Sequence, residues 1–378
     1  MAVIVRWLGA AAVIAVATGS AAAAEPAPLH GAPLTGKTGL RLLVASVPPL
    51  LVDVDSGHVA RITGLPLQGR PVLSVSAVGK DAVVWLDRPS RGVPRAEIYV
   101  VRHDATKATR LAAAWDVAPS SDGRAVWLKS FADARHCTLR ELWLDGDDRR
   151  RARPVPCSTR VVDSGSGGLL VQGSSVVDPD SRRVILRTGL WAMAGRFALI
   201  ASKSGPAVLN LRTGTRWRLR WPSQIGGATS QGGVDQAAVA TDGKFIAVSF
   251  SDPAWQGGGT QVTDIWLLNP LTRRFQHLPD MPAAVSLKFT SMTWASRQRL
   301  VMLAQTAQHD VVAVWHPGQK QFHVRRVQLP ERNSGSDSFV VWSARSRRRN
   351  ARGEPCAGSI PAASTFSDIA QTAGVTSR

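Results

Sequence analysis

The residues best suited to ligand chemistry lie in one irregular insertion, Ser251–Val262, with the sequence SDPAWQGGGTQV. Trp255 offers an aromatic surface, Asp252 and Gln256 offer hydrogen-bonding groups, and three consecutive Gly residues let the backbone adapt. Loops held by a rigid scaffold are the usual place for binding residues. The pattern predicts recognition of a partner. The alternative is that Trp255 packs back on its own structural unit.

Two other loops supply cationic candidates. Arg91 lies in the segment RPSRGVPRA, and Arg135 is followed directly by His136. We expect these loops to share a rim with the Trp255 loop and to neighbour it. Arginine and aromatic groups together suit an acidic protein segment or an anionic glycan.

The sequence lacks the usual catalytic and metal-binding patterns. Its eight His residues show no H-x-H or H-E-x-x-H spacing, and no G-x-S-x-G elbow is present. The acidic turns at Asp53–Gly57 and Asp145–Asp148 lack the further ligands of a calcium loop, so we interpret them as hairpin turns. We therefore expect no cofactor and no metal. The alternative is an enzyme with clustered carboxylates in a central funnel.

Two of the three cysteines flank one predicted hairpin. Cys137 and Cys157 are equidistant from the Asp145–Asp148 turn, so they face each other if the strands pair regularly. An oxidising compartment would favour a disulfide between them. The alternative is a pair of free, buried thiols. Cys356 is left over.

A recurring unit defines the architecture. An apolar strand, a variable loop and a further strand recur seven times at intervals of roughly 32–57 residues. The seven copies of the further strand are marked by Val52, Tyr99, Trp143, Val177, Leu209, Trp266 and Trp315. Repeats of about 40–45 residues with four strands each are typical of a β-propeller. We predict an all-β, seven-bladed β-propeller.

The composition of the strands supports this prediction. Runs such as KFIAVSF are apolar at consecutive positions, as expected for strands buried on both faces. The strands TRWRLRW and RRFQHL alternate with charge, which suits the outer edge of a blade. The first unit lacks an inner strand, and Ser338–Trp342 is a spare one. We therefore predict that the N- and C-terminal strands pair beside Arg41–Val47 and close the ring.

Two turns carry a family resemblance. Ser120-Ser121-Asp122-Gly123-Arg124 and Ala240-Thr241-Asp242-Gly243-Lys244 resemble the turn of TolB-like (PD40, WD40-like) propeller repeats. The resemblance covers residues 40–342 as a repeat pattern and implies fold, not activity. A weaker resemblance to quinoprotein repeats rests on Asn210–Trp217, but the sequence shows no cofactor constellation.

The charge of +19 arises from 46 basic and 27 acidic residues, and only 8 of the basic residues are Lys. An Arg-rich chain of this kind suggests a GC-rich genome, so the charge alone does not establish a binding surface. No base-reading or stacking motif is visible, which argues against specific nucleic-acid binding. We expect a monomer.

The ends of the chain differ from its centre. Residues 1–24 resemble a signal peptide with Arg6 before the apolar stretch, and residues 25–38 read as a linker before the propeller at 39–343. An uncleaved membrane anchor is the alternative. No later segment is apolar over about 18 residues, so we expect a soluble mature chain.

Residues 344–378 form a basic tail without periodicity, which we expect to be disordered. Cys356–Ala362 can be encoded by a self-complementary nucleotide sequence that resembles an arm of a transfer-RNA gene. If the gene has this sequence, the tail is not part of the evolved domain. We expect an exported protein, periplasmic, cell-envelope or secreted, that binds a protein or an anionic envelope polymer through its rim loops. A propeller enzyme acting on an envelope polysaccharide is the alternative.

Overall fold

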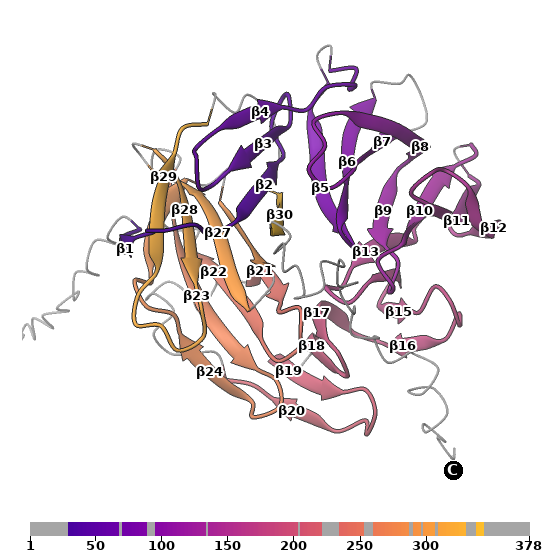
Figure 1. The fold of residues 1–378 in the computed structure, drawn as a ribbon. Helices are drawn as coiled ribbons and strands as arrows, with labels where there is room; N and C mark the ends of the chain where they lie inside the picture. The colour runs from indigo at the N-terminus through magenta and orange to yellow at the C-terminus, as the bar shows by residue number, and fades with distance from the viewer. Residues whose placement is uncertain are drawn as a thin grey trace, which may run out of the picture.

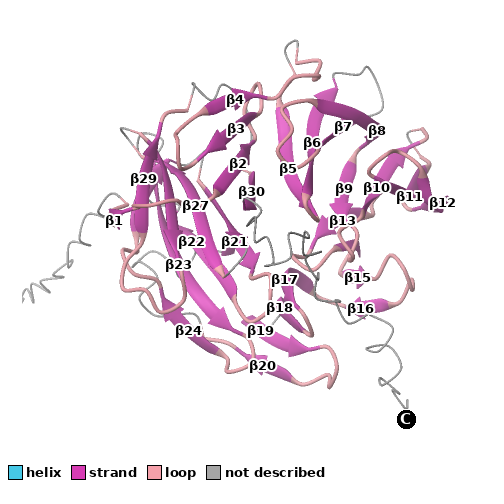
Figure 2. Cartoon of the chain, viewed as in Figure 1, coloured by secondary structure: helices cyan, strands magenta, loops and turns pink. Residues whose placement is uncertain are grey.

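The strands form seven antiparallel sheets that surround a central axis as blades (Figure 1). The computed structural model describes residues 29–67, 70–88, 95–133, 135–202, 205–220, 234–252, 260–286, 290–295, 298–306, 309–329 and 338–343. Within these residues there is no helix (Figure 2), and hence none that could span a membrane. The predicted seven-bladed β-propeller is confirmed.

Each blade has four main strands, which are consecutive in six blades, while blade 1 takes its inner strand from the C-terminal end; blades 6 and 7 each have one additional strand. The blades contain the following strands, given from the axis outward. Blade 1 holds β30 (Phe339–Ser343), β2 (Leu40–Val44), β3 (Leu50–Asp53) and β4 (Val59–Arg61). Blade 2 holds β5 (Val72–Val78), β6 (Asp81–Arg88), β7 (Arg95–Val101) and β8 (Ala108–Ala114). Blade 3 holds β9 (Asp116–Pro119), β10 (Ala125–Phe131), β11 (Cys137–Trp143) and β12 (Asp148–Val155).

The remaining blades follow the same order. Blade 4 holds β13 (Arg160–Asp163), β14 (Gly168–Gln172), β15 (Ser175–Val177) and β16 (Val184–Leu186). Blade 5 holds β17 (Gly189–Ala194), β18 (Phe197–Ser202), β19 (Gly205–Asn210) and β20 (Arg216–Arg218). Blade 6 holds β21 (Val234–Val239), β22 (Ile246–Asp252), β23 (Thr260–Asn269) and β24 (Arg274–His277), with β25 (Ala283–Ser286) pairing to β23. Blade 7 holds β26 (Ser291–Ala295), β27 (Arg299–Gln305), β28 (Asp310–Trp315), β29 (His323–Val327) and β1 (Ala32–Pro33).

The apolar core is divided among the spaces between blades. Each of the seven clusters of buried residues joins two neighbouring blades. All six residues of β28 are buried, because both faces of a middle strand contact an adjacent blade. The outermost strand β12 is mostly exposed and carries four arginines.

The Asp-Gly turns are structural, as their resemblance implies. Asp122 Oδ1 accepts hydrogen bonds from the Ser120 hydroxyl at 2.6 Å and from the Arg124 backbone N–H at 3.0 Å. Gly123 has φ +66°, and its Cα lies close to the Gly79 turn of the neighbouring blade. A side chain at Gly79 would collide with the Gly123 carbonyl oxygen, so both turns need glycine.

The C-terminal strand closes the ring as predicted. β30 pairs antiparallel with β2, with Leu42 opposite Val341 and Val44 opposite Phe339. Phe339 and Trp342 are buried, in the clusters that blade 1 shares with blade 7 and with blade 2 respectively. Blade 1 is therefore built from both ends of the chain.

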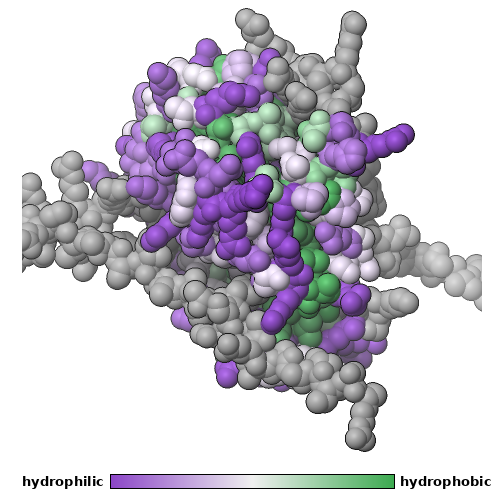
Figure 3. Space-filling model, turned by 90° about the vertical axis from the view of Figure 1, so that its right-hand side faces the viewer, coloured by the Kyte–Doolittle hydropathy of each residue, from purple (hydrophilic) through white to green (hydrophobic). Residues whose placement is uncertain are grey.

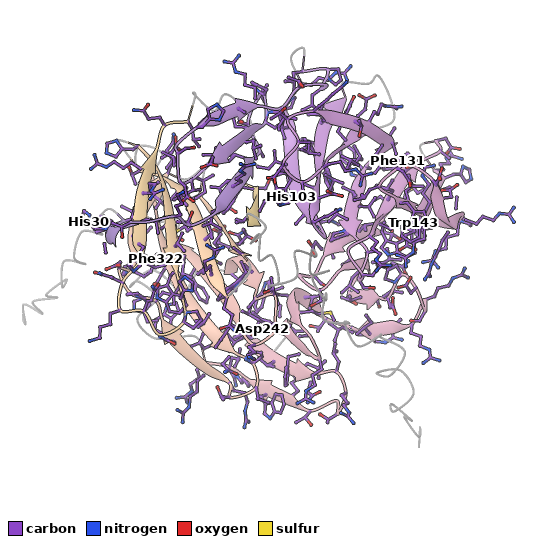
Figure 4. All side chains as sticks on the ribbon, viewed as in Figure 1. His30, His103, Phe131, Trp143, Asp242 and Phe322 are labelled. Atoms are coloured by element: carbon purple, nitrogen blue, oxygen red, sulfur yellow. A yellow bond between two sulfur atoms is a disulfide. The ribbon has the colours of Figure 1, made fainter. Side chains whose placement is uncertain are left out.

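The N-terminal segment also contacts the ring. β1 lies within residues 25–38, assigned above to a linker, and pairs in parallel with β29. Leu29 is buried with Phe322, and Figure 4 shows His30 and Phe322 near each other on blade 7. A Cβ at Gly31 would lie 2.5 Å from the Phe322 carbonyl oxygen, so the strand approaches closely. The residues that pack on the propeller thus begin before residue 39.

Asp55 connects the N-terminal segment with blades 1 and 7. Its carboxylate accepts hydrogen bonds from the backbone N–H groups of Thr38 and Gly39, each at 2.7 Å. Arg325 on blade 7 lies 3.4 Å from the same carboxylate and donates to the carbonyl oxygens of Val54 and Leu34, each at 2.6 Å. One ion pair thus links blade 1, blade 7 and the N-terminal segment.

The predicted disulfide between Cys137 and Cys157 is present, but its register differs from the expectation. Cys137 lies opposite Val155, because the hairpin turn is centred on Asp145 and not midway between the two cysteines. Two irregularities in the pairing of β11 and β12 bring Cys137 closer to Cys157 but do not place them opposite each other. Cys157 follows the end of β12, where Lys129 donates to the carbonyl oxygens of Cys157 at 3.4 Å and Thr159 at 2.5 Å. The disulfide therefore ties β11 to the connection between blades 3 and 4.

Truncation tests the ring closure. A chain ending at Ser343 should keep the melting temperature of the full chain, because β30 is retained. A chain ending at Asp337 loses the buried Phe339, Val340 and Trp342, a loss of more than about 5 kcal/mol of unfolding free energy. Calorimetry measures both. Equal melting temperatures for the two truncations would contradict closure by β30.

Asp55→Asn tests the junction of the chain ends. Burial alone would raise the pKa of Asp55, but hydrogen bonds from Thr38 and Gly39 and the charge of Arg325 lower it below 3.8. The ionised carboxylate therefore stabilises the fold above about pH 4, and this contribution disappears as the pH falls.

At pH 7 the Asp55→Asn variant should lose about 1–3 kcal/mol of unfolding free energy, and the difference from wild type should shrink in acid. Asp145→Asn, in an exposed turn of blade 3, is the control and should change stability by less than about 0.5 kcal/mol. Urea unfolding at several pH values measures both. A pH-independent loss at Asp55 would refute the electrostatic account.

Candidate functional site

The loop that carries the sequence candidates extends a hairpin of blade 6. β22 and β23 continue pairing up to Asp252 opposite Val262, so both ends of the predicted insertion belong to the sheet. Trp255 and Gln256 lie outside the described residues, as do Arg91 and the side chain of Asp252. Their role in binding stays a prediction.

Arg135 and His136 lie on blade 3, in the connection from β10 to β11, and both are exposed. Asp133 organises this loop: its carboxylate accepts from the backbone N–H groups of Arg135 and His136, and the His136 ring nitrogen Nδ1 lies 2.7 Å from Asp133 Oδ2. The hydrogen bond from the Arg135 N–H, with those from His136, lowers the pKa of Asp133. The loop is held by one carboxylate.

The expectation that these loops are neighbours does not match the ring order. Arg135 and His136 belong to blade 3 and Asp252 to blade 6, with blades 4 and 5 between them. The repeat pattern indicates which rim the loops share, but the positions of the loops around the ring depend on the order of the blades. A small ligand therefore does not contact both loops.

The inner strands offer two carboxylates with perturbed acidity. Desolvation by the surrounding inner strands raises the pKa of Asp163, at the end of β13, and of Asp235, near the start of β21, although both residues remain accessible to solvent. Inner strands of all blades run in the same direction, so these residues lie at opposite ends of the channel. The described residues contain no group of three or more His, Cys, Asp or Glu side chains that could hold a metal ion.

A groove of about 780 Å³ lies between the outer edges of blades 5 and 6, where β20 and β24 run (Figure 1). Four arginines and three aromatic residues dominate its lining. The described lining residues are Arg216, Trp217, Arg218, Leu219, Arg220, Trp266, Thr272, Arg273 and Phe275. None of these nine carries a carboxylate, so the groove is strongly cationic.

Arg273 enters the groove from a strained turn. In the β23–β24 turn the Asn269 carbonyl oxygen accepts from the Arg273 N–H at 2.7 Å, and Arg273 has φ +62°. The same turn between β19 and β20 places Gly214 at this position, with φ +69°. A left-handed backbone costs a non-glycine residue about 1–2 kcal/mol. Arg182 occupies the same position in the equivalent turn of blade 4, with φ +60°, so arginine is tolerated there.

Aromatic rings hold this arginine in place. The Arg273 guanidinium lies 4.9 Å from the centre of the Trp217 ring, and Phe197 packs at 6.3 Å from the same ring. A guanidinium stacked on a ring keeps its N–H donors in its own plane, where they can bind an anion.

Trp266 is fixed from behind the groove. Its Nε1 donates to the buried Asp264 at 3.0 Å, and its ring stacks on His277 at 4.3 Å. His277 Nε2 lies 2.6 Å from the other oxygen of Asp264. These contacts fix the Trp266 ring. Both oxygens of the Asp264 carboxylate are occupied by Trp266 and His277.

A second arginine cluster, on blade 3, differs in its charge balance. Arg149 lies 4.5 Å from the ring of Trp143, at the outer part of the blade (Figure 4). Arg149 and Arg150 both form ion pairs with Glu141, and Arg150 also pairs with Asp180 at 2.7 Å. Figure 3 shows this side of the molecule as largely hydrophilic. Its arginines form ion pairs within blade 3 and between blades 3 and 4.

Part of this groove is visible in the sequence. The alternating arginines of TRWRLRW predict an outer strand, and β20 is the outermost strand of blade 5. The turn Asn269–Arg273 repeats the pattern of Asn210–Gly214 with Arg in place of Gly. That exchange at a left-handed position marks Arg273, but no sequence pattern shows that two outer strands on different blades share a groove.

No protein-family model matches the chain, and no curated protein does either. A solved structure of a protein from Lactobacillus plantarum is 12% identical, with a TM-score of 0.50, over 80% of this chain and 99% of the other. The β-propeller domain of the Trilobed protease from Pyrococcus furiosus is 11% identical, with a TM-score of 0.48, over 82% and 100%. An uncharacterised protein from Listeria monocytogenes is 12% identical, with a TM-score of 0.43, over 73% and 87%. Similarity at this level of identity indicates fold and not function, and membership of the TolB-like repeats stays a prediction.

Arg273→Gly removes the guanidinium without disturbing the turn. The gain from relieving the left-handed backbone is offset by the chain entropy of glycine and the lost contact with Trp217, so stability should change by less than about 1 kcal/mol. Arg182→Gly is the matched control, because Arg182 has φ +60° in the equivalent turn of blade 4. Urea unfolding measures both. A loss above about 2 kcal/mol for Arg273→Gly alone would mean that its side chain is structural.

Proposed function

We propose that this chain is an exported β-propeller that acts as a binding or scaffold protein for a protein or an anionic polymer of the cell envelope. The observation that carries the proposal is the concentration of four arginines at the outer edges of blades 5 and 6, around a groove whose nine described lining residues include no carboxylate. Multivalent guanidinium sites favour partners with several carboxylate or phosphate groups. The net charge of +19 adds long-range attraction for such partners.

Export is supported by the disulfide and by the signal-like N-terminus. Disulfides form and persist mainly in oxidising compartments, and Cys137–Cys157 ties down a connection between two blades. An exported propeller would meet envelope polymers and envelope proteins directly.

The rim loops are a second contact surface in this proposal. Arg135 and His136 are exposed on blade 3, and the loop with Asp252, Trp255 and Gln256 extends from blade 6. Because these loops are far apart in the ring, a partner that contacts both is a macromolecule. The enzyme alternative needs clustered carboxylates, and Asp163 and Asp235 lie at opposite ends of the channel, so binding is the better account.

Capture of partners from an envelope fraction tests the proposal with the full chain as bait. Arg218→Glu with Arg220→Glu reverses two charges of the groove, and Trp255→Ala with Arg135→Ala alters the rim. The matched control is Arg151→Glu with Arg187→Glu, which makes the same charge change at exposed positions of blades 3 and 4. We expect the groove variant to bind at least about tenfold less partner and the control to bind normally.

The outcomes are distinct. Loss in the groove variant alone supports the groove as the contact surface. Loss in the rim variant alone supports partner binding but moves it to the rim loops. Capture that is unchanged in both variants, or reduced equally in the control, contradicts recognition through these surfaces.

A further inference from the structure

A long stretch of the chain carries positive charge and no negative charge. From Ser181 to Val234 the sequence contains eight Arg, one Lys and no Asp or Glu. The stretch covers the end of blade 4 and the whole of blade 5. On blade 3, by contrast, Glu141 pairs with Arg149 and Arg150. The acid-free stretch therefore concentrates positive charge in one sector of the ring.

Part of this charge lies in turns at one end of the propeller. The turns that join first to second and third to fourth strands lie at the same end of every blade, because neighbouring strands are antiparallel. We call this end the turn rim. On the consecutive blades 4, 5 and 6 (Figure 1) it carries four exposed arginines, namely Arg182, Arg196, Arg212 and Arg273. Within the described part of the chain, none of the four forms an ion pair with a carboxylate.

Two exposed apolar side chains lie in the same sector. Leu271, in the β23–β24 turn, is 63% exposed, and Val184, directly after the β15–β16 turn, is 46% exposed. Among the described residues the one other exposed large apolar side chain is Leu73, on blade 2. Single exposed apolar residues are common on protein surfaces, but here two of three lie beside the arginines of the turn rim.

The turns that carry these side chains are ordered. In blade 6 the side-chain oxygen of Asn269 accepts hydrogen bonds from the backbone N–H groups of Leu271 and Thr272, each at 3.0 Å. In blade 5 the side-chain oxygen of Asn210 accepts from the N–H of Arg212 at 3.0 Å. Arg212 and Leu271 thus occupy equivalent positions. Two adjacent blades present a cation and an apolar group from the same kind of turn.

This combination suits a membrane surface. Basic side chains are attracted to the phosphates of anionic lipids, and an apolar side chain next to them can enter the boundary between headgroups and acyl chains. Separate turns of adjacent blades at one end of the propeller also fit an extended surface better than a single strand of polymer.

We infer that the turn rim of blades 4, 5 and 6 docks on an anionic lipid bilayer, with its arginines on the lipid phosphates and Leu271 inserted between the headgroups. This goes beyond the proposed function, because the partner is a lipid surface and the side chains tested below, Arg196, Arg212 and Leu271, are outside the described lining of the groove. A soluble polyanion would bind the arginines but would give Leu271 no apolar environment.

Co-sedimentation of the full chain with lipid vesicles tests the inference. Vesicles of phosphatidylcholine are compared with vesicles in which about one third of the lipid is phosphatidylglycerol. The measured quantity is the gain in binding that the anionic lipid brings. The N-terminal apolar segment and the basic tail are present in every variant, so their contribution is common to all of them.

Reversal of two charges tests the arginines. Arg196→Glu with Arg212→Glu should reduce binding to the anionic vesicles at least about tenfold, because the contributions of basic side chains near a charged bilayer add up. Lys80→Glu with Arg124→Glu is the matched control, since it makes the same charge change at exposed positions on the turn rim of blades 2 and 3. The control should keep more than about half of the binding, because charges away from the bilayer are screened.

A truncation tests the apolar contact. Leu271→Ala should weaken binding to the anionic vesicles about threefold, because less apolar surface then leaves water. Leu73→Ala shortens the exposed apolar side chain of blade 2 and should leave this binding unchanged.

Two results would overturn the inference. Equal loss in the two charge-reversal variants would mean that only the net charge of the chain matters. Undiminished binding by Leu271→Ala would mean that the arginines act alone, as they would toward a soluble polyanion. Neither result affects the proposed function, because partner capture is tested with other variants and without vesicles.

Discussion

The fold depends on apolar packing between the faces of adjacent blades. No blade has a core of its own: each of the seven clusters is completed by residues from two blades, so every blade needs a neighbour on both sides. A linear row of such blades would expose two apolar faces, and the ring removes both. This explains why the last described strand, β30, belongs to blade 1 and the N-terminal strand β1 belongs to blade 7. The Asp55–Arg325 pair lies where these two closures meet.

The packing constraint also explains which features were predictable. Strands buried on both faces must be apolar at consecutive positions, and runs such as those of β22 and β27 recur once in each unit. Blade number, strand order and the closing strand follow from that repeat. The Asp122 and Asp242 turns were recognisable because a short acidic side chain before a left-handed glycine commonly caps a tight turn by accepting a backbone hydrogen bond.

The site was less predictable because it depends on geometry between distant segments. The disulfide was expected from symmetry about a turn, but the turn is centred on Asp145, so Cys157 lies beyond the end of the ladder. The connections β10–β11 and β22–β23 lie on the same rim because they join the same two strands of their blades. How far apart they lie around the ring follows only from the order of the blades. The groove combines Arg218 of blade 5 with Arg273 of blade 6, which are far apart in sequence and carry no shared motif. Its recognition needed both the strand register and the left-handed backbone at Arg273.

The left-handed turn position has a consequence for how the groove could have arisen. The four equivalent turns hold Gly57, Arg182, Gly214 and Arg273 at φ values from 60° to 71°, so the backbone accepts either residue. Glycine codons of the form GGN and arginine codons of the form CGN differ by a single base. One nucleotide change in a duplicated blade is therefore enough to add a guanidinium beside Trp217, and one change removes it. The scaffold can gain or lose this charge in a single evolutionary step while its blades stay the same.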